Sequence, residues 1–143
     1  MSDAVSKAIE EAKATLERCH AAFNSRDSVA QTAEMQFPHM WLTSDNRFIE
    51  WATAKELLST QNELTARLKA EGWDHTETTS LGMAQAGEDK VHLALRESLV
   101  KADGTEYNGF DTLWVFTKID RRWRLQFRSS FLAGTAQGVG GNS

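Results

Sequence analysis

The sequence has very little of the residues that would place it outside the ordinary globular class. It contains one cysteine and one proline among 143 residues. A single cysteine excludes an internal disulfide and fits a reducing compartment, so we expect a cytoplasmic protein. No apolar run approaches the roughly 18 residues that a membrane helix needs. The charged first residues also predict no signal peptide, and we expect no membrane partner.

Strong charge of either sign is also missing. Lysine and arginine total 16 against 20 acidic residues, a net charge of −4, which argues against a nucleic-acid partner. The arginines around Trp123 are interpreted as a solvated turn. The chain has no glycine-rich nucleotide motif, no nucleophile elbow and no histidine pair with zinc spacing. We therefore expect no metal and no cofactor.

The composition that is present, 41% apolar and 25% charged, is typical of a folded domain. No linker or repeat divides the chain, so residues 1–132 are predicted to form a single domain. The last ten residues carry four glycines and nothing that would bury a face. We expect residues 133–143 to form a flexible tail.

The first half of the chain predicts three helices. Apolar residues recur at steps of three and four from Val5 to Phe23, which predicts a helix over 3–24. Asp27 or Ser28 begins a short second helix through about residue 35, which Pro38 ends. Thr53 and Glu56 have the spacing of a capping box, so a third helix begins there and ends near residue 72.

The second half changes to the alternation of strands. Strands are predicted at 37–43, 47–51, 73–86, 91–101, 105–118 and 123–132. The last four are joined by connections too short for crossovers, so neighbours must be antiparallel. Helices followed by a long meander give an α+β class with a curved, mostly antiparallel sheet of about six strands.

Three segments carry a resemblance to a known superfamily. They are the helix ending at 22–27 (AFNSRD), the strand opening at 37–39 (FPH) and the closing strand at 123–131 (WRLQFRSSF). Together they make residues 5–132 resemble the nuclear-transport-factor-two-like fold, also called SnoaL-like, ketosteroid-isomerase-like or cystatin-like. The resemblance implies a cone-shaped sheet folded around the long first helix, a small hydrophobic molecule inside it and a homodimer.

The resemblance also implies where catalytic groups of the isomerase-type members would fall. Their carboxylate base corresponds to Ser44, their helix tyrosine to Cys19 and their late-strand acid to Thr112. None of the three matches. Asp45 stands one residue from the first of these positions and is interpreted as a turn residue. Asp111 is placed on the outer face, paired with Arg128 or Arg124.

Strand alternation supplies the remaining candidates. Glu97 shares a face with neighbouring leucines, where an isolated carboxylate is suited to acid–base chemistry. Catalytic candidates are Glu97, His39 and Asp45, and each has a structural alternative that is left open. Glu97 would lie at the wet rim of the sheet or pair with an arginine, His39 would hold a backbone group, and Asp45 would be a turn residue. The residues expected to line a ligand cavity are Cys19, Phe23, Leu42, Ser44, Leu95, Glu97, Thr112, Trp114, Phe116 and Phe127.

Aromatic residues are available to line a cavity, and the acid–base residues of the isomerase-type members are not matched. Together these observations favour a module that binds a small hydrophobic or aromatic molecule. One alternative is a small cofactor-independent isomerase, dehydratase or hydrolase that uses the candidates above. A second alternative is a dimeric interaction protein whose cone is filled by side chains. Glu97 isolated inside a cavity would favour the enzyme, and a cavity lined only by Leu, Phe, Trp and Thr would favour binding. A cavity too small for a ligand would favour the interaction protein.

Overall fold

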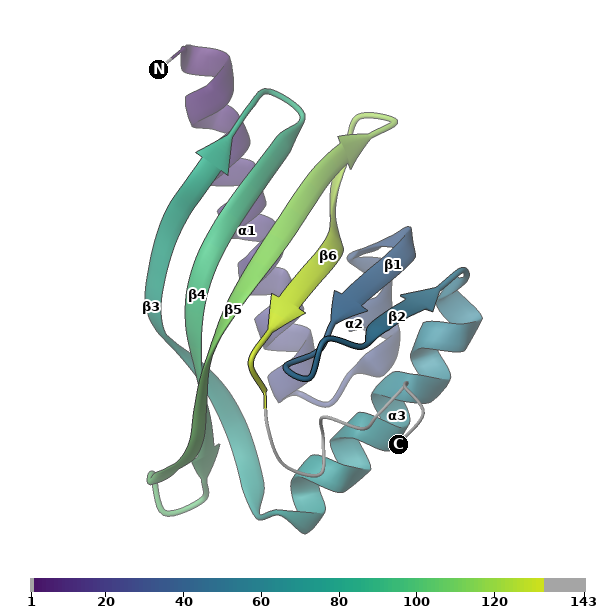
Figure 1. Cartoon of the computed structure of the whole chain (residues 1–143), viewed down its shortest axis with the longest axis vertical. Coiled ribbons are helices and arrows are strands. Elements are labelled where there is room, and N and C mark those ends of the chain that lie inside the picture. The colour runs from purple at the N-terminus through teal and green to yellow at the C-terminus, as the bar shows by residue number, and fades with distance from the viewer. Residues whose placement is uncertain (1, 133–143) are drawn as a thin grey trace.

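The computed structural model describes residues 2–132 and contains three helices and six strands in the described chain (Figure 1). Their order is α1 (Asp3–Asn24), α2 (Ser28–Ala33), β1 (Met35–Leu42), β2 (Phe48–Trp51), α3 (Ala54–Ala70), β3 (Trp73–Ala86), β4 (Lys90–Lys101), β5 (Glu106–Ile119) and β6 (Arg122–Ser130). The predicted tail at 133–143 lies outside the described residues.

The six strands form one sheet in the order β2-β1-β6-β5-β4-β3. β1 pairs in parallel with β6, and every other neighbouring pair is antiparallel. The sheet is strongly curved, and α1 runs along one face of it (Figure 1). We call the face covered by the helices the inner face. The predicted α+β class with a six-stranded, mostly antiparallel sheet is confirmed.

The helix ends follow from the sequence signals. Ser2, Asp27 and Thr53 cap the three helices by accepting a backbone N–H with their side-chain oxygens. In the capping box of α3, the carboxylate of Glu56 accepts from the backbone of Ala52 at 2.9 Å, one residue before the cap itself. The predicted boundaries of α1 and α3 therefore match the structure.

The boundary between α2 and β1 differs from the prediction. The short helix ends at Ala33 and β1 begins at Met35, so Pro38 lies inside a strand instead of ending a helix. The carbonyl of Glu34 accepts the backbone N–H of Leu125 at 2.9 Å. Because the backbone pairs with β6 here, β1 begins at Met35, two residues before the predicted start of the strand at residue 37.

The end of α1 is fastened to the sheet by the same segment that carried the resemblance. The amide of Asn24 donates to the carbonyl of Thr76 at 2.9 Å and accepts that residue's N–H at 2.8 Å. The guanidinium of Arg26 lies 4.7 Å from the ring centroid of Trp73. These contacts fix the helix terminus against β3, beside the space described below.

A bulge in β6 changes which of its side chains face inward. Leu125 pairs with Phe116 and Phe127 pairs with Val115, so Gln126 is an extra residue in the ladder. A bulge reverses the faces beyond it. Phe127 therefore lies on the outer face, where it stacks on Phe48 with ring centroids 6.3 Å apart.

Two further expectations are wrong for the same reason. Phe131, which strict alternation from Trp123 places on the same face as that tryptophan, is 66% exposed. Arg128, expected on the outer face beside Asp111, pairs with Trp114 and Trp41 on the inner face. No ion pair of Asp111 with an arginine is found within residues 2–132.

Over residues 2–132, no helix combines the length and the apolar character that a membrane crossing requires.

Candidate functional site

A cavity lies between the inner face of the sheet and the three helices. It leaves about 90 Å³ for the centres of water molecules. One buried water needs roughly 10–15 Å³, so the space suits several waters or one small organic molecule. Its walls come from all three helices and from β1–β6: Cys19, His20, Phe23, Gln31, Trp41, Trp51, Thr60, Gln61, Leu64, Leu68, Thr76, Glu97, Leu99, Phe110, Trp114, Arg128, Ser130 and Leu132.

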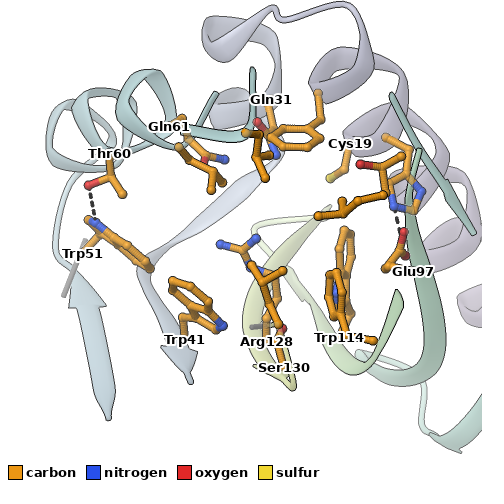
Figure 2. Close-up of a pocket in the computed structure, with 18 residues that line it drawn as sticks. Cys19, Gln31, Trp41, Trp51, Thr60, Gln61, Glu97, Trp114, Arg128 and Ser130 are labelled. Atoms are coloured by element: carbon orange, nitrogen blue, oxygen red, sulfur yellow. Dashed lines mark hydrogen bonds and ion pairs between the residues drawn. The ribbon is translucent and has the colours of Figure 1, made fainter. Parts of the chain in front are cut away.

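Three tryptophans contribute to the apolar wall of the cavity (Figure 2). Trp41 and Trp51 lie on neighbouring strands with nearly parallel rings, 13° apart in plane and 6.5 Å apart at the centroids. The indole N–H of Trp51 donates to the hydroxyl of Thr60 at 2.9 Å, which fixes the ring orientation. The N–H of Trp114 donates to Thr112 at 3.1 Å. The rings of Trp51 and Trp114 are thus held in place, with their polar edges satisfied.

Arg128 places a cation in this apolar space. The bulge in β6 turns its side chain inward, and its guanidinium carbon lies 6.0 Å from the ring centroid of Trp41. Its Nε is buried and has no hydrogen-bond partner. Burial lowers the pKa of Arg128 to about 10, so the group stays protonated at neutral pH. Within residues 2–132, no carboxylate lies at ion-pair distance from it.

Two glutamines face the cavity from the helices. Gln31 of α2 is 5% exposed and Gln61 of α3 is 1% exposed. The side-chain N–H₂ of Gln61 is buried without an acceptor. An unsatisfied buried donor costs about 1–3 kcal/mol, so its position calls for an explanation. Figure 2 shows both glutamines across the cavity from Arg128.

At the other end of the cavity a histidine and a carboxylate form a pair. The Nε2 of His20 lies 3.1 Å from Oε1 of Glu97, whose side chain is 3% exposed. The hydroxyl of Thr78 lies 3.2 Å from Nδ1 of the same histidine and 3.2 Å from the same carboxylate. The ring of His20 packs on Trp114 with centroids 5.3 Å apart. This cluster can exchange a proton with a bound molecule.

Cys19 also lines the cavity, but its chemistry is that of a packed thiol. Burial is the main cause that raises its pKa to about 12, and the charge of Glu34 adds to the shift. The thiolate needed for nucleophilic attack is therefore scarce at neutral pH. Cys19 serves as a small apolar wall residue.

The structure brings four of the expected cavity residues together: Cys19, Phe23, Glu97 and Trp114. The other six lie elsewhere. Leu95 and Phe116 belong to the buried inner-face core, and Thr112 is buried between the indole of Trp114 and the hydroxyl of Ser130. Leu42 and Phe127 pair with outer-face positions, and the hydroxyl of Ser44 donates to the carbonyl of Leu132.

Two of the three catalytic candidates do not reach the cavity. Asp45 is in the loop between β1 and β2, where its carboxylate accepts from Thr43 and, at 3.1 Å, from Arg47. Asp45 is therefore a turn residue, which is the structural interpretation that the sequence analysis gave it. His39 is fully buried, with Nδ1 3.1 Å from the carbonyl of Leu125. Only Glu97 of these candidates lines the space described here.

Sequence reasoning missed most of the polar groups of the site. His20 was not among the candidate residues, yet it borders the cavity together with its neighbour Cys19, because the cavity spans more than one face of α1. Arg128 was assigned to the wrong face because the bulge leaves no mark in the alternation. Trp41 and Trp51 could have been found as inward positions of the first two strands. Gln61 lies one turn after Leu57 on the buried stripe of α3.

No cluster of three potential metal ligands is present among residues 2–132.

His39 gives the fold a predicted pH dependence. Burial, then the charge of Arg128, holds the pKa of His39 well below its usual value, while the Leu125 carbonyl acts in the opposite direction. Below about pH 6.5 the unfolded chain binds a proton at this site that the folded chain does not. The free energy of unfolding should therefore fall with decreasing pH, by up to about 1.4 kcal/mol per pH unit.

The measurement is urea denaturation between pH 7 and pH 5 for the wild type, His39→Phe and the control His75→Gln. We expect the acid-side loss to shrink in His39→Phe. His75 is half-buried and its pKa is raised by Glu77 and Asp74, so its replacement should not reduce the loss. Equal slopes in the wild type and His39→Phe would contradict a neutral buried His39.

The comparisons with known proteins identify the family. A family model described as NTF2-like protein (DUF6841) matches residues 10–128. The chain belongs to this NTF2-like family. The predicted resemblance is therefore confirmed. A sequence search of curated proteins finds no match.

Solved structures agree with the NTF2-like fold. A cystatin-like protein of unknown function from Nostoc punctiforme has a TM-score of 0.68 at 11% identity, over 87% of this chain and 90% of the other. An NTF-2 like protein of unknown function from Shewanella oneidensis has a TM-score of 0.68 at 14% identity, over 86% and 98%. The protein Aln2 from a Streptomyces species has a TM-score of 0.70 at 10% identity, over 88% and 91%. At these identities the likeness concerns the fold alone.

Proposed function

We propose that this NTF2-like protein binds a small, largely hydrophobic molecule in the cavity between the helices and the inner face. The observation that carries the proposal is a space of about 90 Å³ whose walls are aromatic and whose few polar groups converge on it. Binding sites for small molecules have this character. A cone filled by its own side chains, the interaction-protein alternative, would leave no such space.

The size of the space favours a molecule with one ring. Trp41 and Trp114 border it, with the parallel ring of Trp51 beside Trp41. An apolar cavity of about 150 Å³ is known to bind benzene, so spaces of this order accept single rings. Neutral one-ring compounds such as benzyl alcohol are therefore suitable first probes.

The proposal is tested by thermal unfolding with benzyl alcohol. A ligand that binds only the folded state raises the midpoint with concentration. We expect this rise in the wild type and its loss in Leu64→Trp, because Leu64 lines the cavity and the larger ring fills it. Leu58→Trp is the matched control on the same helix, away from the cavity, and should respond like the wild type. No rise in the wild type, or an equal rise in Leu64→Trp, would contradict the proposal.

A second candidate function, a small acid–base enzyme, is favoured by one specific observation. The Nε2 of His20 and the Oε1 of Glu97 lie 3.1 Å apart at the edge of the cavity, where a bound carbonyl compound would meet them. An isomerase begins by removing a proton beside a carbonyl. The test is deuterium exchange into the methyl group of acetophenone, followed by NMR. Exchange that is absent, or unchanged in His20→Asn, would exclude this role.

We also propose that the protein forms a homodimer through the outer face of the sheet. Apolar side chains on and beside this face are exposed: Phe48 is 59% and Phe131 66% exposed. Phe127 stacks on Phe48 within the same patch. Light scattering should give twice the chain mass. Phe127→Asp should shift the mass to that of a monomer, while Val29→Asp on α2 should not. A monomeric wild type at high concentration would contradict the proposal.

A further inference from the structure

Arg128 has no counter-ion among the described residues, although a cation in an apolar space requires one. A charge removed from water is costly unless an opposite charge or several hydrogen bonds compensate it. Within residues 2–132 no carboxylate lies within 4.0 Å, and the Nε is buried without a partner. The thiol of Cys19, with its pKa raised by burial, stays neutral and supplies no charge.

A second unsatisfied donor faces the same space from the opposite wall. The side-chain N–H₂ of Gln61 is buried and has no acceptor, and the residue as a whole is only 1% exposed. It comes from α3, whereas Arg128 comes from β6, so two distant elements bring donors to one cavity. Polar groups buried without partners are rare in folded proteins. Both donors would be satisfied by a single molecule that carries acceptors.

The chemistry of these donors selects the acceptor. A guanidinium is a planar fork that binds a carboxylate through two parallel hydrogen bonds. A single cation balances a single negative charge. Glu97 lines the far end of the cavity, with Trp114 standing between it and Arg128, so a doubly charged ligand would meet repulsion there (Figure 2). The walls around the guanidinium are indole rings.

We propose that the cavity is a receptor for a small monocarboxylate with an aromatic or similarly apolar body. The carboxylate binds Arg128 and the amide of Gln61, and the body lies between Trp41 and Trp114. This inference rests on the proposed function and specifies the class of its ligand. The bulge in β6 is then a functional feature, because it alone turns residue 128 toward the ligand.

The test compares benzoate with benzamide, which has the same shape without the charge. Calorimetric titration of the full chain is made at neutral pH and constant ionic strength. A charge-assisted hydrogen bond is worth about 1.5–3 kcal/mol, so we expect benzoate to bind roughly tenfold to hundredfold more tightly. Arg128→Met should remove this preference and change benzamide affinity by less than about twofold, because only the charged contact is lost.

Two further variants make the result specific. Arg124→Met removes the same charge from the same strand, at a position paired with Thr117 and outside the cavity, and should keep the preference for benzoate. Arg128→Lys should restore part of it, because the charge returns without the fork. Circular dichroism and thermal unfolding show that each variant is folded.

The outcomes separate this inference from the proposed function. Equal binding of benzoate and benzamide, both blocked in Leu64→Trp, would overturn the carboxylate inference and leave the binding function standing. A benzoate preference that survives in Arg128→Met would also overturn it. Failure of both compounds and of benzyl alcohol to bind would overturn the two proposals together. Loss of the preference in Arg128→Met alone supports the inference.

Discussion

Replacing Trp114 with alanine is expected to lower the free energy of unfolding by about 3–5 kcal/mol, the usual cost of removing a buried aromatic side chain. The indole is 7% exposed and packs on Phe116 at 6.2 Å and on His20 at 5.3 Å between ring centroids. Its N–H donates to Thr112 at 3.1 Å, so truncation also removes a buried hydrogen bond. Chemical denaturation with urea measures the loss.

The matched comparison is Trp114→Phe, which keeps a ring in the wall and loses the N–H. We expect this variant to cost less than half as much as the alanine variant. The alanine variant should also admit larger probes than benzyl alcohol, because the cavity loses one wall. A cost below about 1 kcal/mol for Trp114→Ala would mean that the ring borders open solvent and contributes little packing.

Replacing His20 with leucine is expected to lower the free energy of unfolding by about 1–3 kcal/mol, because the buried carboxyl group of Glu97 loses a polar partner that lies 3.1 Å away. The histidine is the closest positively chargeable group to Glu97, at 3.1 Å, and the carboxylate is 3% exposed. After the substitution, the hydroxyl of Thr78 is the only hydrogen-bond partner of that carboxylate among residues 2–132. Because leucine keeps the apolar contact with Trp114, the loss of unfolding free energy reports mainly on the contact between His20 and Glu97.

A double-mutant cycle separates the pair from the packing of each residue. The second substitution is Glu97→Gln, which removes the charge and keeps the shape. If the loss in His20→Leu arises because the carboxylate of Glu97 is left without a partner, the double variant should be more stable than His20→Leu alone. Strictly additive losses would show that the two side chains contribute independently, against the geometry described above.

Local signals made most of the fold predictable. Capping residues and apolar stripes located α1 and α3, and turn residues located the hairpins of β3–β6 to within about two residues. The inward side chains of β4 followed from alternation because that strand pairs with β5 in a regular register from Lys90 to Leu99. The parallel pairing of β1 with β6 joins residues about ninety positions apart, so no local pattern indicates where that ladder begins.

The site was less predictable because it depends on a single inserted residue and on packing between distant elements. Alternation and helical periodicity pointed to Glu97, Trp114, Cys19 and Phe23, and these four residues border one cavity. Beyond Gln126 the same alternation predicted the wrong face for each side chain. It placed Phe127 inside and Arg128 outside, whereas the structure shows the reverse. A bulge arises from the pairing between two strands, so the hydrophobic pattern of one strand does not predict where it lies.

The most direct test of the binding cavity is NMR of the indole N–H groups in ¹⁵N-labelled protein titrated with benzyl alcohol and with benzoate. The chain has five tryptophans, of which Trp41, Trp51 and Trp114 line the cavity. We predict that these three signals move on titration and that those of Trp73 and Trp123 stay in place. Signals that all remain unchanged, or that move most at Trp123, would contradict the account.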